Sequence, residues 1–312
     1  MENVSAPVEE KTYAPHIALI AVQMLFGCAP VVGKIALLAF SSYAIVGVRV
    51  GGAALAFYFL QRLRGSLALE HTKDYLYFAV FSLFGVILNQ LLFFRGLSLT
   101  TATNTSLLAV TIPIFTILIS SLIGNDRLNW KKIVGIISAA CGVIYLIDPA
   151  KASFSSATTL GDIFIILNSL CYAVYVAVSK RLISKYGALK SIAWLFIFGS
   201  LVNVPVGIYF LRTVEISNVS AAAWIALAAI VIFPTILAYY WNAWALARVE
   251  PSIVAVYIYL QPLIGTISAI IFLGEKFSVR LLTSAALIFI GVFLVTRRKI
   301  NRDEIYPTNK FG

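Results

Sequence analysis

Amide and tyrosine side chains stand inside long apolar stretches of this 312-residue sequence. Asn168, Tyr172 and Tyr175 follow i, i+4, i+7 spacing, so they share one face of a helix. Similar side chains occur in the other apolar stretches, at Gln23, Asn89, Gln90, Tyr239, Asn242, Tyr257 and Gln261. Polar groups inside a membrane are costly and mark candidate substrate pathways. Alternatively, each could form a hydrogen bond to a neighbouring helix, which stabilises the bundle by about 0.6 kcal/mol. As a set, they predict a substrate-binding cavity lined by aromatic rings and amides.

Arg49 is the one cation that the sequence places plainly within an apolar stretch, about six residues from its predicted outer end. Two interpretations are open. The long side chain could extend to the outer membrane interface, as basic side chains near helix ends do. Alternatively it faces the cavity, where the planar guanidinium would bind a carboxylate of the substrate. The second interpretation adds Arg49 to the candidate substrate-binding residues.

Acidic side chains and histidines are missing from the middle of the apolar stretches, because all 13 carboxylates and both histidines lie in predicted tails, loops or helix ends. A proton relay needs a buried group that titrates. The sequence therefore favours a facilitator or exchanger driven by the gradient of its substrate, unless Asp162 or Glu250 extends inward. The three cysteines have no metal-ligand spacing, and no H-E-x-x-H, G-x-S-x-G or P-loop motif occurs. We expect neither an enzyme with catalytic residues nor a metal or other cofactor.

The composition indicates which solvent surrounds these residues. Hydrophobic residues make up 61% of the chain and charged residues 12%, and the mean hydropathy is +0.93, whereas a soluble domain carries roughly 25% charged residues. The net charge is +11, but the basic residues stand in short polar gaps between apolar stretches, as juxtamembrane anchors do. We therefore expect a membrane protein whose partners include lipid and exclude nucleic acid.

About 20 apolar residues in a helix cross the hydrocarbon core of a bilayer. Such stretches must be helical, because unpaired backbone polar groups are not tolerated in lipid. We expect spans near residues 16–38, 43–61, 74–95, 98–123, 130–148, 160–181, 188–211, 220–246, 250–273 and 278–296. The predicted fold class is an all-α membrane protein with ten transmembrane helices and short connections.

Basic residues set the orientation of membrane helices, because they are retained on the cytoplasmic side. With the N-terminus inside, the two tails and the inward connections hold 17 lysines and arginines, whereas the outward connections hold six. This bias predicts that both tails, 1–15 and 298–312, are cytoplasmic. The N-terminal segment has neither the basic region nor the cleavage site of a signal peptide, so we expect the first apolar helix to be retained.

The two halves of the chain resemble each other. Pro113 precedes Gly142 by 29 residues, and Pro262 precedes Gly291 by the same 29. FFRGLSL at 93–99 and NAWALAR at 242–248 match at the same offset of 149. An odd count of five helices per copy would turn the second copy upside down, with the substrate between the copies near the midplane. We predict inverted repeats at 16–148 and 160–297; chance similarity among apolar helices is the alternative.

The order of these motifs resembles the EamA family of the drug/metabolite transporter superfamily. The resemblance rests on the proline-to-glycine–glutamate stretch 262–277, on GCAPVVGK at 27–34 and on VRVGGAALAF at 48–57, and it covers about 17–297. It implies two EamA repeats, a central cavity, and efflux or exchange of amino acids, metabolites or drugs. The chain departs from the pattern at Phe26, where tryptophan is common, and at Asn125-Asp126, which replaces glycine–glutamate.

We therefore expect a secondary transporter that moves small organic molecules by alternating access across a plasma membrane, which is the inner membrane if the source is prokaryotic. Its partners would be a small-molecule substrate and lipid, and it would be a monomer or a homodimer. A channel and a non-transporting receptor or scaffold are the alternatives. No loop resembles a selectivity filter, and no sizeable signalling domain or tail is present.

Overall fold

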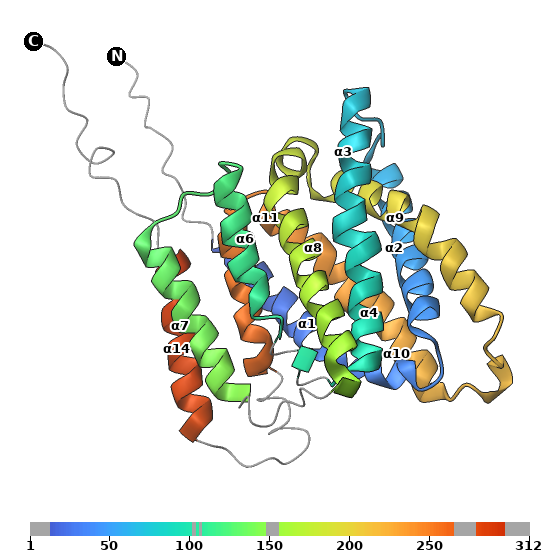
Figure 1. The fold of residues 1–312 in the computed structure, drawn as a ribbon. Helices are drawn as coiled ribbons and strands as arrows, with labels where there is room; N and C mark the ends of the chain where they lie inside the picture. The colour runs from blue at the N-terminus through green and yellow to red at the C-terminus, as the bar shows by residue number, and fades with distance from the viewer. Residues whose placement is uncertain (1–12, 102–103, 106–107, 148–155, 265–278, 297–312) are drawn as a thin grey trace, which may run out of the picture.

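The apolar stretches of the first half form helices that run between two ends of the molecule (Figure 1). The computed structural model describes residues 13–101, 104–105, 108–147, 156–264 and 279–296. The helices of the first half are α1 (Ala14–Leu37), α2 (Ser42–Arg64), α3 (Thr72–Ser82), the π-helix η1 (Leu83–Leu88), α4 (Asn89–Leu99), α6 (Thr111–Leu122) and α7 (Trp130–Ile147). Because α3, η1 and α4 follow one another without a break, they form one continuous helical stretch.

The second half follows the same plan. Its helices are α8 (Ser156–Tyr186), α9 (Ala188–Leu211), the short 3₁₀ helix η3 (Ile216–Asn218), α10 (Ala221–Val231), the π-helix η4 (Ile232–Leu237), α11 (Ala238–Leu246), α12 (Pro251–Val256), the 3₁₀ turn η5 (Tyr257–Tyr259) and α14 (Val279–Thr296). Here α10, η4 and α11 form the continuous stretch. Gly187, with φ of +78°, makes the tight turn from α8 to α9.

Six of the described helical stretches are long and apolar enough to cross a membrane, and three shorter helices are apolar as well. Large apolar side chains such as Leu55, Leu118 and Phe293 are more than half exposed, which suits contact with lipid. The described residues contain no strand. These observations confirm the prediction of an all-α, multi-pass membrane protein.

The predicted span 98–123 differs from the structure, because α4 ends at Leu99 and α6 begins only at Thr111. Thr100 has an extended backbone, with φ of −123° and ψ of −176°. Thr101 then accepts a hydrogen bond from the backbone N–H of Asn104 at 3.0 Å, and such local bonds compete with a continuing helix. Of the predicted segments, residues 1–12, 102–103, 106–107, 148, 265–278 and 297–312 lie outside the described residues.

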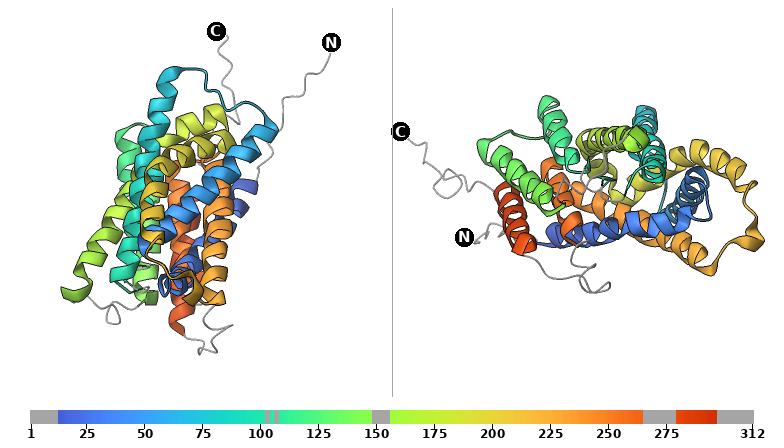
Figure 2. Two further views of the ribbon diagram at one scale, coloured as in Figure 1. Left: turned by 90° about the vertical axis from the view of Figure 1, so that its right-hand side faces the viewer. Right: turned by 60° about the horizontal axis from the view of Figure 1, so that its bottom comes forward.

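Helices from the two halves pair with each other at opposite edges of the molecule. α7 packs against α14 at one edge and α2 against α9 at the other, with the remaining helices between them (Figures 1 and 2). Glycines permit these approaches: a Cβ at Gly47 would lie 2.5 Å from the Cα of Gly207, and one at Gly135 would lie 2.7 Å from the carbonyl oxygen of Gly291. Small residues at the contact are typical of helix packing in membranes.

Polar contacts tie the bundle together at both ends. The upper end of Figure 1 holds the connections 65–71, 123–129 and 247–250, and the lower end holds 38–41, 212–220 and the C-terminal end of α4. At the upper end Lys132 forms ion pairs with Asp126 and Glu250. At the lower end the Thr100 hydroxyl donates to Asp162 at 2.6 Å, and its carbonyl accepts from Lys34 at 2.9 Å. The candidate site lies between these two closures.

Candidate substrate site

Two π-helices place the polar residues of the continuous helical stretches. η1 and η4 have six residues each, and η4 begins and ends 149 positions after η1. Single π-turns inside α-helices are frequent at functional sites, because the extra residue shifts the side chains that follow. Asn89 and Gln90 come directly after η1, and Tyr239 comes two residues after η4.

A cavity of about 100 Å³ lies among α1, α2, α4, α8, α11 and the segment around η5. Seven of the eleven predicted substrate-binding residues line it: Arg49, Asn89, Gln90, Asn168, Tyr172, Tyr239 and Gln261. The rest of the lining is mostly apolar, with Phe26, Phe93 and Ile112 among its members. An apolar wall with a few placed polar groups is the usual character of a small-molecule site.

Hydrogen bonds hold the amides and one tyrosine of the lining in fixed orientations. The Gln90 amide donates to the hydroxyl of Tyr239, which lies 3.1 Å from Asn89 Oδ1. The Asn168 amide donates to the backbone carbonyl of Asn89 at 2.7 Å. Because α4, α8 and α11 each contribute to this network, it joins helices from both halves of the chain around the cavity.

Arg49 points into the molecule rather than toward its surface. The side chain lines the cavity, and the residue is only 4% exposed. Its Nε donates to Thr235 Oγ1 at 2.9 Å, and its guanidinium carbon lies 5.0 Å from the centre of the Phe94 ring. This position favours the interpretation that Arg49 faces the cavity.

Four predicted residues lie outside the cavity lining. Gln23 stands behind Gln261 and accepts its amide hydrogen bond at 2.7 Å. The Tyr175 ring packs beside Tyr172 and would lie 2.7 Å from a Cβ at Gly85, so it fills space between α8 and η1. The last two are Asn242, which is buried in α11, and Tyr257, whose hydroxyl lies 2.8 Å from His16 Nδ1 at the start of α1.

Three contributors to the site were missed by sequence reasoning. Thr235 holds Arg49, Phe94 lies beside the guanidinium, and Thr105 is part of the lining. Pro234, inside the apolar stretch that becomes η4, was the available signal for an irregular helix near Thr235. Among the described residues no three His, Cys, Asp or Glu side chains are grouped so that they could hold a metal ion.

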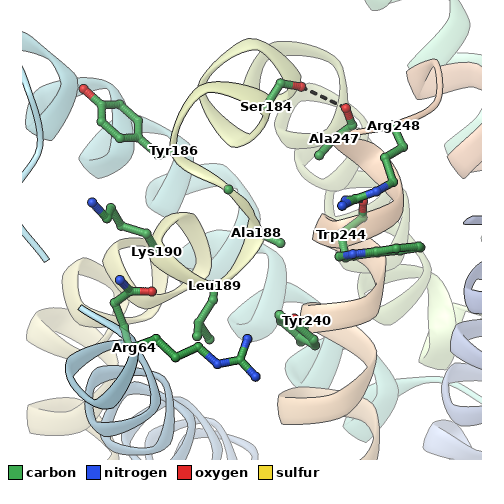
Figure 3. Close-up of a pocket in the computed structure, with 12 residues that line it drawn as sticks. Arg64, Ser184, Tyr186, Ala188, Leu189, Lys190, Tyr240, Trp244, Ala247 and Arg248 are labelled. Atoms are coloured by element: carbon green, nitrogen blue, oxygen red, sulfur yellow. Dashed lines mark hydrogen bonds between the residues drawn. The ribbon is translucent and has the colours of Figure 1, made fainter. Parts of the chain in front are cut away.

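A second, larger cavity of about 560 Å³ opens at the upper end of the molecule (Figure 3). We call it the vestibule. Arg64 reaches into it from one side, and Tyr240, Trp244 and Arg248 line the opposite side. Lys190 is a third cation of its lining, which contains no carboxylate among the described residues. Its positive charge makes it attractive to anions.

Comparisons with known proteins agree with this architecture. The EamA-like transporter family matches the chain twice, over residues 14–147 and 159–297. The uncharacterised transporter YyaM of Bacillus subtilis is 24% identical, covering 95% of this chain and 97% of the relative. A probable terminal-alkyne amino-acid exporter of Streptantibioticus cattleyicolor is 22% identical, covering 83% and 86%. A protein of known crystal structure has the same fold, with a TM-score of 0.74 and 18% identity over 92% of this chain and 97% of that protein.

Proposed function

Because the chain belongs to the EamA-like transporter family, we propose that it is a secondary transporter that moves small organic molecules across a plasma membrane by alternating access. The observation that carries this proposal is the cavity between the two closed ends of the bundle, whose apolar wall carries a few placed polar groups. Transported molecules would be amino acids, metabolites or drugs, in efflux or exchange. The relative from Streptantibioticus, named a probable terminal-alkyne amino-acid exporter, supports amino acids within this range.

The proposed architecture has ten helices in two inverted five-helix repeats, at 16–148 and 160–297. Contacts between the halves support this architecture, because they occur in symmetric pairs. If residue i contacts residue j + 149, then residue j contacts residue i + 149, as in a two-fold interface. A Cβ at Gly135 would meet the carbonyl of Gly291, and one at Gly142 would meet the carbonyl of Ser284, at 2.7 and 3.0 Å. Discontinuous helices near such an interface are where inverted-repeat carriers bind their substrates.

Alternating access requires that each end of the cavity open in turn. Lys34 donates to the carbonyl of Thr100 at the lower end, at 2.9 Å, and Lys180 donates to that of Val249 at the upper end, at 2.6 Å. Thr100 and Val249 are 149 positions apart, so the two closures use equivalent carbonyls. Equivalent contacts at opposite ends support two states of the transporter. In one the upper contact is broken and that end is open, and in the other the lower contact is broken.

The proposed orientation puts both termini and the upper end in the cytoplasm. The 17-to-6 distribution of basic residues carries it. Arg62, Arg64, Lys185 and Lys190 are among the basic residues of the upper end, whereas the described lower end holds fewer, among them Lys34, Arg95 and Arg212. We propose lipid and a small-molecule substrate as partners, for a protein that is a monomer or a homodimer.

The test is counterflow of radiolabelled amino acids and metabolites into proteoliposomes that contain the purified protein. A transporter gives saturable exchange that stops when the cavity is filled, and Ala29→Trp fills it because Ala29 is part of its lining. A channel would pass ions without saturation, and a receptor would bind without flux. Either result, from a well-folded protein, overturns the proposal.

A further inference from the structure

The guanidinium of Arg49 has unused hydrogen-bonding capacity that faces the cavity. Thr235, bonded to Nε, is its only hydrogen-bond partner among the described residues. Both terminal amino groups of the planar fork remain available, and these are the groups that bind a carboxylate in the two-bond geometry. Within the described part of the chain, the two terminal amino groups of Arg49 thus have no protein partner and can bind a ligand.

The protein holds this fork in one orientation. The Thr235 hydroxyl donates to the carbonyl of Ile230 at 2.7 Å, so its oxygen is left to accept from Arg49 Nε at 2.9 Å. The Phe94 ring lies beside the guanidinium, with 5.0 Å between its centre and Cζ. Thr235 and Phe94 thus act as positioning residues, which lowers the entropic cost of binding.

Among the residues that the structure describes, the charge of Arg49 has no counterion. The ion pairs of the described residues join Lys132 to Asp126 and Glu250, and Lys185 to Glu70 and Asp74; none involves Arg49. No carboxylate is part of the described cavity lining either. A buried charge is stable only when it is paired, so the missing partner is expected to arrive with the substrate.

A single carboxylate matches this site better than a phosphate does. One guanidinium neutralises one carboxylate, whereas a phosphate group brings about −1.5 to −2 charges and would leave an excess in an otherwise neutral cavity. The volume of about 100 Å³ accommodates roughly seven to ten water-sized groups. Phe26, Phe93 and Ile112 offer apolar contact to the rest of the molecule.

We propose that Arg49 binds the carboxylate of a compact organic monocarboxylate with an apolar or aromatic body, an inference that rests on the proposed function of the cavity. The vestibule agrees with it, since Arg64, Lys190 and Arg248 would attract the same anions to the upper end. An α-amino acid would also bring an ammonium group into the cavity, and this group would bind to neutral oxygens of the lining.

The test compares carboxylates with neutral carboxamides of the same shape. Thermal stabilisation of the purified protein is measured with benzoate against benzamide, with butyrate against butyramide, and with L-norvaline. We expect at least one carboxylate to stabilise the protein and its amide to be weaker by about tenfold or more, the size of a charge-assisted hydrogen bond. L-Norvaline against butyrate distinguishes α-amino acids from simple acids.

Variants connect this preference to Arg49. Arg49→Gln should remove the difference between acid and amide, and Arg49→Lys should keep only part of it, because a lysine lacks the planar fork. Thr235→Val should weaken carboxylate binding by about threefold without changing amide binding. Thr116→Val is the matched control, since the one described partner of the Thr116 hydroxyl is in its own helix, the carbonyl of Ile112. If Arg49→Gln does not fold, Thr235→Val decides the question.

The outcomes separate this inference from the proposed function. If other compounds show counterflow but no carboxylate binds, the carboxylate site is refuted and the transporter function is retained. The same holds if carboxylates bind equally well to the Arg49 and Thr235 variants. Carboxylate binding that depends on Arg49, without flux of any compound, would leave the site standing and refute transport. Absence of both binding and flux would overturn both.

Discussion

The side-chain amide of Gln90 donates a hydrogen bond to the hydroxyl of Tyr239, and the two residues stand 149 positions apart. This separation is the offset at which the halves of the sequence repeat, so the bond joins equivalent positions of the two halves. A contact between equivalent positions lies on the axis that relates them. Gln90 and Tyr239 both line the cavity, so in the proposed inverted-repeat architecture the candidate site lies on that axis.

The Gln90–Tyr239 bond should couple the two halves energetically. Tyr239→Phe removes the hydroxyl but keeps the ring, and Gln90→Leu removes the amide at similar volume. We expect a double-mutant cycle to give a coupling of about 1 kcal/mol, within the range of side-chain hydrogen bonds between membrane helices. Thermal unfolding in detergent measures it. Tyr209→Phe, at an exposed position, is the control and should change the unfolding temperature little. If the effects of Gln90→Leu and Tyr239→Phe simply add, the bond is not formed.

The ion pairs of Lys132 should stabilise the closed upper end. Lys132→Met leaves Asp126, whose side chain is fully buried, without its cation, while Glu250, with a side chain 42% exposed, can turn to solvent. We expect a loss of about 3 kcal/mol, the cost of breaking a buried pair, seen as a lower unfolding temperature. Lys131→Met, at the exposed neighbouring position, should change little. Adding Asp126→Asn to Lys132→Met should restore most of the stability; no recovery would mean that the ion pair is not the cause.

Transport should not require a proton gradient. The buried carboxylate nearest to the lower end, Asp162, is 7% exposed and takes hydrogen bonds from Thr100 and Asn104, at 2.6 and 3.0 Å, outside the cavity lining. We therefore expect counterflow to persist when ionophores collapse the membrane potential and the pH difference. Strict dependence on the proton gradient, lost in Asp162→Asn, would instead identify Asp162 as a coupling residue.

Much of the fold and part of the site followed from residue types and spacing. Hydrophobic length placed the helices, and the shared face of Asn168 and Tyr172 was enough to put both in the cavity. Tyr175 lies on the same face but packs against the backbone at Gly85. Helical spacing predicts which face of the helix a side chain is on, but not how closely the neighbouring helix approaches it. That distance depends on which helices pack together.

Other features depended on tertiary structure from the start. In the sequence Thr235 is one threonine within an apolar stretch; in the structure it lies in η4 and bonds Arg49, which is in a helix far away in the chain. The sequence predicts Arg64, Lys190 and Arg248 as membrane anchors at helix ends, whereas the structure places them in the vestibule lining. Basic residues in both roles stand in the same short polar gaps, so the sequence does not distinguish them. The two open interpretations of Arg49 could be separated only by the direction of its side chain.

Labelling of a cavity residue from each side of the membrane tests alternating access most directly. Ala29→Cys, in a background with Cys28, Cys141 and Cys171 replaced by serine, puts one thiol in the cavity lining. Alternating access predicts that a membrane-impermeant thiol reagent reaches this cysteine in both right-side-out and inside-out vesicles, and that a transported compound slows the reaction from either side. Reaction from one side only, in a well-folded protein, would contradict the account.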